Sequence, residues 1–167
     1  MRSALLLGLL LVLAAPASAG STRQVDLPRL FAGELATIRA GTDVPVLLPQ
    51  KLPSESRRHV PSGGADERGW TLAIGAVPDC GGATACFIAS FSATRGERPH
   101  FRRRVTLSGG QVGYFKALSC GASCSPPVIE WYRAGVLYAI QATVGTQRTE
   151  RRLLIRMANS AIRSGPR

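Results

Sequence analysis

The four cysteines are the residues of this sequence with the most distinctive chemistry. Cys80 and Cys86 enclose five residues, and Cys120 and Cys124 enclose three. Four cysteines allow three pairings. We expect the two local pairs, because each pair encloses small residues that can turn sharply enough to bring the sulfurs together. On a chain-entropy model each of these bridges stabilises the fold by roughly 2 kcal/mol.

Two other uses of these cysteines have weaker support. A thiol-disulfide oxidoreductase usually carries Cys-x-x-Cys at the N-terminus of a helix, where the thiol pKa is lowered. Cys120 and Cys124 are one residue further apart, and Pro126 and Pro127 lead from them into an expected strand. Zinc sites favour other spacings, and export favours oxidation of thiols over metal capture. The sequence therefore indicates structural disulfides and no metal site.

Hydrolytic chemistry has little support in the sequence. His59 and His100 lie in polar stretches, and no Gly-x-Ser-x-Gly nucleophile motif accompanies them. Glu130 is the one acidic residue inside an expected strand. A catalytic Ser/His/Asp cluster whose members are distant in the sequence and meet only in the fold remains an alternative. The paired glycines lie in loops without a following helix, so no phosphate loop or cofactor is indicated, and no residue is assigned a catalytic role.

The chain is strongly basic, with a formal net charge of +11 that comes almost entirely from arginine. Such a charge favours anionic neighbours. The candidate anion-binding residues form two clusters, one of Arg102, Arg103 and Arg104 and one of Arg152, Arg156 and Arg163. The partners considered are an anionic envelope polymer, lipid head groups and an acidic protein, and nucleic acid is not expected. The alternative is that these arginines are simply solvated, because charge runs are usually exposed faces.

The elements that would position these residues can be read from hydrophobic spacing and turn residues. Apolar residues at helical spacing predict a helix over residues 27–40. Residues 44–48 are typical of an edge strand, because Pro45 cannot donate to a ladder. Residues 52–69 are rich in Ser, Gly, Pro and charge and are predicted to be a loop. Further strands are expected over residues 70–77, 86–93, 103–107, 112–118, 128–133 and 136–143.

Two hairpins are expected in the second half of the chain. A two-residue turn at Gly109 and Gly110 would set Arg104 opposite Phe115, within reach of a cation–π contact. A turn at Ala134-Gly135 would likewise set Trp131 opposite Tyr138 and Ile129 opposite Ile140. Because most aromatic pairs at this spacing are structural, we favour core packing over an aromatic platform for a ligand.

A helix is predicted over residues 150–163, with an apolar stripe on one face and Gly165-Pro166 at its end. The predicted fold class is α+β. In it an antiparallel sheet of about six strands packs against this C-terminal helix, and an additional N-terminal helix covers the same face or an end.

The N-terminus has the features of a secretory signal peptide. A positive charge at Arg2 precedes an apolar run, Pro16 and the small residues Ala17 and Ala19, which predicts cleavage after Ala19. The apolar run is too short for a permanent anchor, and no other run in the mature chain qualifies as transmembrane. We therefore divide the chain into a signal peptide over 1–19, a flexible terminus over 20–26 and one α+β domain over 27–167.

Two stretches resemble a C-terminal domain of exported bacterial proteins. The first is the L-P-x-x-L-P pattern at residues 48–53, and the second is I-x-W-x3-G-x2-Y at residues 129–138, followed by a helix containing Met157-Ala158-Asn159-Ser160. That family has no assigned catalytic residues, so none is carried over to this chain. The paired cysteine loops depart from its commoner pattern. The resemblance implies an α+β module of the cell envelope.

These observations favour a non-enzymatic binding or structural module of the periplasm or exterior. One alternative is an enzyme, either a redox protein using Cys120 and Cys124 or a hydrolase. The other is a small secreted inhibitor that presents the loop over residues 78–86.

Overall fold

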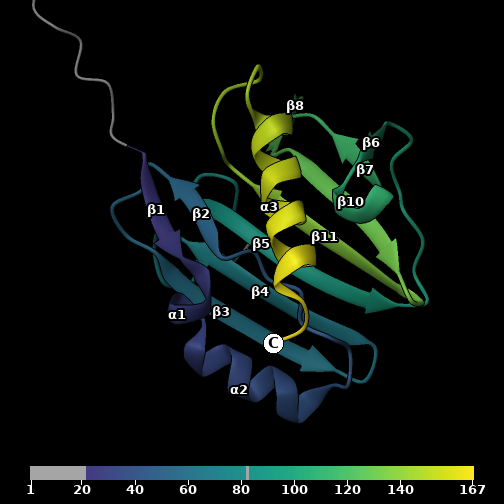
Figure 1. Ribbon diagram of the computed structural model, residues 1–167. Coiled ribbons are helices and arrows are strands. Elements are labelled where there is room, and N and C mark those ends of the chain that lie inside the picture. The colour runs from purple at the N-terminus through teal and green to yellow at the C-terminus, as the bar shows by residue number, and fades with distance from the viewer. Residues whose placement is uncertain (1–21, 82) are drawn as a thin grey trace, which may run out of the picture.

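The computed structural model describes residues 22–81 and 83–167. The expected signal peptide over 1–19 lies outside the described residues and stays a prediction. The architecture is α+β, with a seven-stranded antiparallel sheet that carries the C-terminal helix on one face (Figure 1). The fold class agrees with the sequence prediction, but the sheet has seven strands and not six.

The large sheet has the strand order β3-β4-β5-β11-β10-β7-β6. Its strands are β3 (Val60–Asp66), β4 (Gly69–Gly75), β5 (Phe87–Arg95), β6 (Arg104–Thr106), β7 (Val112–Lys116), β10 (Val128–Arg133) and β11 (Val136–Ala142). Two further antiparallel pairs are formed by β1 (Arg23–Asp26) with β2 (Lys51–Ser54) and by β8 (Ser119–Cys120) with β9 (Cys124–Ser125). The helices are α1 (Leu27–Leu30), α2 (Ala32–Gly41) and α3 (Glu150–Ser164), and a 3-10 turn covers Ser108–Gly110.

The predicted C-terminal helix is confirmed as α3. Leu154, Met157 and Ala158 are buried between this helix and the sheet. Glu150 in the first turn is only 4% exposed, and its carboxylate accepts the N–H of Leu118 at 3.1 Å. The helix is therefore fixed at its start by a polar contact and along its length by apolar packing.

The predicted N-terminal helix is present as α1 and α2, which meet at Phe31. Asp26 caps α1, because its carboxylate accepts the N–H of Arg29 at 3.0 Å. Phe31, Leu35 and Ile38 are buried, and α2 packs against β3 at one end of the sheet. The two helices therefore extend the core that α3 begins.

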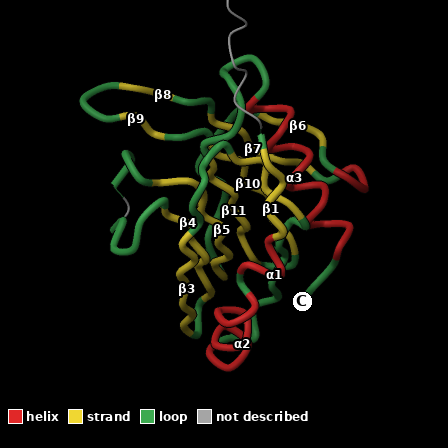
Figure 2. Tube along the Cα trace, turned by 90° about the vertical axis from the view of Figure 1, so that its left-hand side faces the viewer, coloured by secondary structure: helices red, strands yellow, loops and turns green. Residues whose placement is uncertain are grey.

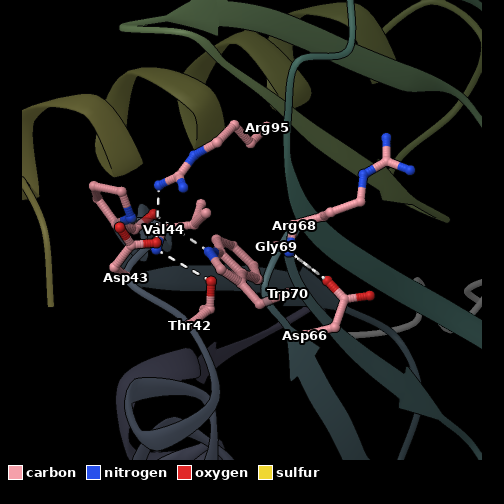
Figure 3. Close-up of polar contacts among 9 residues, drawn as sticks. Thr42, Asp43, Val44, Asp66, Arg68, Gly69, Trp70 and Arg95 are labelled. Atoms are coloured by element: carbon pink, nitrogen blue, oxygen red, sulfur yellow. Dashed lines mark hydrogen bonds and ion pairs between the residues drawn. The ribbon is translucent and has the colours of Figure 1, made fainter.

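The predicted edge strand at 44–48 was wrong. These residues pair with no strand in the described part of the chain, and most of their side chains are buried in the core. Side-chain contacts hold the segment across the end of the sheet (Figure 3). The indole N–H of Trp70 donates to the carbonyl oxygen of Pro45 at 3.3 Å, and Arg95 forms a 2.8 Å ion pair with Asp43.

The loop predicted at 52–69 was also wrong, because it contains part of β2 and all of β3. The residues of β3 read as a turn region, yet each pairs with a residue of β4. The expected flexible terminus at 20–26 likewise contains β1, which pairs with β2 and packs Val25 against the core. In these cases distant partners override weak local propensities.

The two predicted hairpins differ in outcome. In β10–β11 the register is the predicted one, with Trp131 opposite Tyr138, and their rings stack with centroids 5.4 Å apart. In β6–β7 the register differs by one residue, so Arg104 lies opposite Tyr114 and not Phe115. The cation–π contact to Phe115 comes instead from Arg103, whose guanidinium carbon lies 5.6 Å from the ring centroid.

The large sheet has two different faces. One face packs against the helices and the segment at 44–48, and its buried residues include Leu72, Phe91 and Ile140. None of the helices in the described part of the chain lies on the other face (Figure 2). Residues 96–103, which we call the strap, connect β5 to β6 and cover the β10–β7 part of this second face.

Within the described residues, none of the helices combines the length and the apolar character needed to cross a bilayer.

Candidate binding cleft

A cleft of about 650 Å³ lies on the helix-free face of the sheet. Its floor is formed by four residues that lie opposite one another on the neighbouring strands β3, β4, β5 and β11. They are Ser62, Ala73, Ser90 and Gln141. Alternation along each strand explains this row, because the neighbouring residues Leu72, Phe91 and Ile140 point into the core. The floor is therefore built from small or polar side chains that face solvent.

The two disulfides stand at the walls of the cleft. Cys80 bonds to Cys86 and Cys120 bonds to Cys124, as predicted from the small residues between them. We call residues 76–86 and 117–127 the first and second cystine loops. Both project from the helix-free side of the sheet (Figure 2). They contribute Val77, Asp79, Cys80, Gly81, Thr84, Ser123, Cys124, Ser125 and Pro126 to the lining.

The first cystine loop is held tightly against the end of β4. A Cβ atom on Gly75 would lie 2.8 Å from the Cβ of Cys80, so only glycine allows the loop to pack this closely. The N–H of Ala76 also donates to the carbonyl of Cys86 at 2.8 Å. The wall on this side is therefore fixed by packing, a hydrogen bond and a covalent bond.

The second cystine loop is joined to the floor. The side-chain amide of Gln141 donates to the carbonyl oxygen of Pro126 at 3.3 Å. This bond leaves the carbonyl oxygen of the Gln141 side chain free to accept. The floor and the second wall thus meet at a polar group that can still bind a ligand.

The lining is mostly uncharged although the chain is strongly basic. Among the described residues that line the cleft, Asp79 is the single charged side chain, and hydroxyl groups come from β3, β5 and both cystine loops. Val77 is 46% exposed, an unusual exposure for a large apolar residue, and half-buried Phe87 lies on the same lining. The arrangement offers hydroxyl and amide groups next to apolar contact surface.

The strap limits the cleft to one half of the sheet face. Glu130 lies on this face but is only 4% exposed, because its carboxylate accepts both the backbone N–H of His100 at 2.8 Å and a bond from His100 Nδ1 at 2.9 Å. These interactions raise the pKa of His100, and the hydrogen bond to Glu130 contributes most. The Lys116 ammonium also lies 5.7 Å from the Phe101 ring centroid.

The Cys120–Cys124 disulfide differs in its sequence context from the usual redox motif. Cys120 and Cys124 are joined to each other at the tip of the β8–β9 arm, and the next element is strand β10. The chain therefore continues from these sulfurs into a strand, and not into the helix that follows the cysteines of the usual redox motif. Since all four cysteines are in disulfides, none presents a thiolate to a metal. Among the described residues there is also no group of three potential metal-binding side chains.

One serine–histidine pair was missed by the sequence analysis. Ser54 Oγ lies 2.9 Å from His59 Nε2 and also accepts the N–H of Ser56 at 3.2 Å. Burial, with a smaller contribution from the charge of Arg23, lowers the pKa of His59. Ser54 is only 4% exposed, and these bonds hold the turn between β2 and β3. Their spacing of five residues was the signal available in the sequence.

The predicted anion-binding arginines are not brought together. Arg102, Arg103 and Arg104 lie at the β6 edge of the sheet, and Arg152, Arg156 and Arg163 lie on the exposed side of α3. None of these six lines the cleft. Arg163 donates to Ser108 Oγ at 3.0 Å, whereas Arg156 lines a groove between α3 and the β1–β2 strand pair.

No protein-family model, curated protein or solved structure matches this chain.

Proposed function

We propose that this protein is a non-enzymatic binding module that works outside the cytoplasm and receives an uncharged saccharide in the cleft. The observation that carries the proposal is the row of small polar residues on the sheet, enclosed by two cystine loops. A volume of about 650 Å³ falls within the range of small-ligand sites. The cleft is therefore large enough for two or three sugar rings to contact its floor and walls.

The composition of the lining supports binding over catalysis. Hydrolysis by a serine requires a base within hydrogen-bond reach. The described lining contains serine and threonine hydroxyls but neither histidine nor lysine, and its single carboxylate is that of Asp79. The chemistry that these groups offer is hydrogen bonding to a ligand.

The lining also supports an uncharged saccharide as the ligand. A hydroxyl group both donates and accepts, so Ser62, Ser90 and Thr84 can pair with sugar hydroxyls in either direction. Phe87 and Pro126 offer flat apolar surface to the C–H faces of sugar rings. An anionic ligand would meet Asp79 without a lysine or arginine on the described lining to pair with it.

The two disulfides support both the site and the location. Closed loops lose little conformational freedom when a ligand binds, so a wall that is already fixed favours affinity. Disulfides also persist in oxidising compartments, which is the environment that export would provide. The signal peptide expected over residues 1–19 fits the same location.

The test is calorimetric titration of the oxidised chain with the trimer of N-acetylglucosamine, which carries hydroxyl and amide groups and no charge. We expect saturable binding to the wild type. Ala73→Trp places a large ring on the floor of the cleft, so it should weaken the affinity by about tenfold or more.

Thr71→Trp is the matched control, because Thr71 lies on the same strand and the same face but outside the cleft lining. Its affinity should stay within about twofold of the wild type. Absence of binding to the wild type would overturn the saccharide proposal. Equal losses in both variants would show that the sugar binds elsewhere or that the tryptophans act on the fold.

A further inference from the structure

A second site lies on the helix side of the molecule, in the groove between α3 and the β1–β2 strand pair. This groove has a volume of about 290 Å³. Gln24 and Lys51 reach it from β1 and β2, and Arg156 and Ser160 reach it from α3. It brings together one lysine and one arginine that are far apart in the sequence.

The donors in this groove are not used elsewhere in the structure. Within the described residues, Lys51 and Arg156 form no ion pair, and the Gln24 side chain forms no hydrogen bond. Ser160 Oγ accepts the backbone N–H of Gln50 at 3.1 Å, so its own hydroxyl hydrogen remains available. Four donors of different geometry are therefore free to point at one ligand.

No acidic residue occupies the groove in place of a ligand. Asp26 is the nearest acid by strand register, since it lies opposite Lys51. Its carboxylate instead accepts the N–H of Arg29 and caps α1. Acidic residues are absent from the described lining, so the charge of Lys51 and Arg156 is not neutralised there.

We propose that this groove binds the phosphoryl group of a phosphate ester or of inorganic phosphate. A tetrahedral oxyanion presents several acceptor oxygens, which match a guanidinium fork, an ammonium, an amide and a hydroxyl. The arrangement distinguishes Arg156 from the other arginines of α3. The site lies on the opposite side of the sheet from the saccharide cleft and does not depend on it.

The test is an amide NMR titration of the oxidised chain with inorganic phosphate at constant ionic strength, with chloride as the balancing anion. Constant ionic strength is needed because the net charge of +11 attracts all anions, and this general attraction changes with the salt concentration. We expect saturable shifts at the amides of Gln50 and Ser160. Arg156→Gln and Lys51→Gln should each weaken the phosphate affinity by about tenfold, the effect of losing one charged hydrogen bond.

Arg152→Gln is the matched control, because it removes the same charge from the same helix one turn earlier. Its phosphate affinity should stay within about twofold of the wild type. Equal weakening by Arg152→Gln and Arg156→Gln would mean that net charge alone acts, and the proposal would be overturned. Shifts that never saturate in the wild type would overturn it as well.

A second arm identifies the source of the phosphoryl group. Vesicles of phosphatidylglycerol and of phosphatidylcholine are sedimented with the wild type and with Arg156→Gln. Sedimentation with phosphatidylglycerol that is lost in Arg156→Gln would support the site and assign it to a lipid head group. Saturable phosphate binding without sedimentation would support the site and assign it to a soluble phosphate.

Discussion

Removal of the disulfides should destabilise the fold by an amount set by loop length. The bridged cysteines are separated by 6 and 4 positions, so the two closed loops are short. The chain-entropy relation then gives about 2 kcal/mol for each bridge, with the longer loop ahead by about 0.3 kcal/mol. For a chain of this size, each loss lowers the melting temperature by roughly 4–8 °C.

The measurement compares urea unfolding of the wild type with the double variants Cys80→Ser/Cys86→Ser and Cys120→Ser/Cys124→Ser. Neither bridge joins strands of the large sheet to each other, so the urea dependence of the unfolding free energy should change little. A loss well above about 4 kcal/mol from either variant would show that the bridge supports the core and not only a loop. No loss at all would contradict the loop-entropy reasoning.

Other predictions concern backbone packing and titration. Gly69→Ala should destabilise the protein by more than about 3 kcal/mol in the same urea assay, because the added Cβ would overlap a backbone carbonyl oxygen of β5. Gly64→Ala is the control, since a Cβ there would meet no atom within 4 Å, and it should change the stability by less than about 0.5 kcal/mol. In an NMR titration the pKa of His100 should lie above 6.5 and that of His59 below it, and Glu130→Gln should lower the pKa of His100 toward its ordinary value. Because the raised pKa of His100 means that folding favours its protonated form, the stabilisation by Glu130 should be complete below pH 6.5 and lost as the pH rises through that raised pKa.

Local signals predicted the elements whose contacts are local. The β10–β11 register follows from the Ala134-Gly135 turn, where both residues have positive φ, and from aromatic alternation. The β6–β7 register was missed by one residue because a contact from α3 shapes the turn. The side chain of Asn159 accepts the N–H of Ser108 at 2.7 Å, and Leu107 donates its N–H to Gln111.

The seventh strand, β3, could not be predicted from its own residues. Its Pro61, Gly63 and Gly64 are typical of a loop, and it forms a strand because β4 supplies a partner and α2 covers one face. Strand pairing between segments of weak propensity depends on the rest of the fold. The sequence holds that information only in the partner segments.

The sequence predicted the two disulfides that stand beside the cleft, but it did not predict the cleft itself. Short loops of small residues were enough to pair the cysteines correctly. The floor depends on which strands lie side by side, because Ser62 and Gln141 are far apart in the sequence and meet in one row. The strap determines which part of this sheet face is open to solvent. The sequence around Glu130 does not indicate that the strap covers this residue.

The proposed cleft is tested most directly by a crystal structure of the oxidised protein grown with the trimer of N-acetylglucosamine. Our account predicts sugar rings between the two cystine loops, with hydrogen bonds to Ser90 and to the side-chain carbonyl of Gln141. An empty cleft in crystals where the sugar is bound elsewhere on the chain would contradict it.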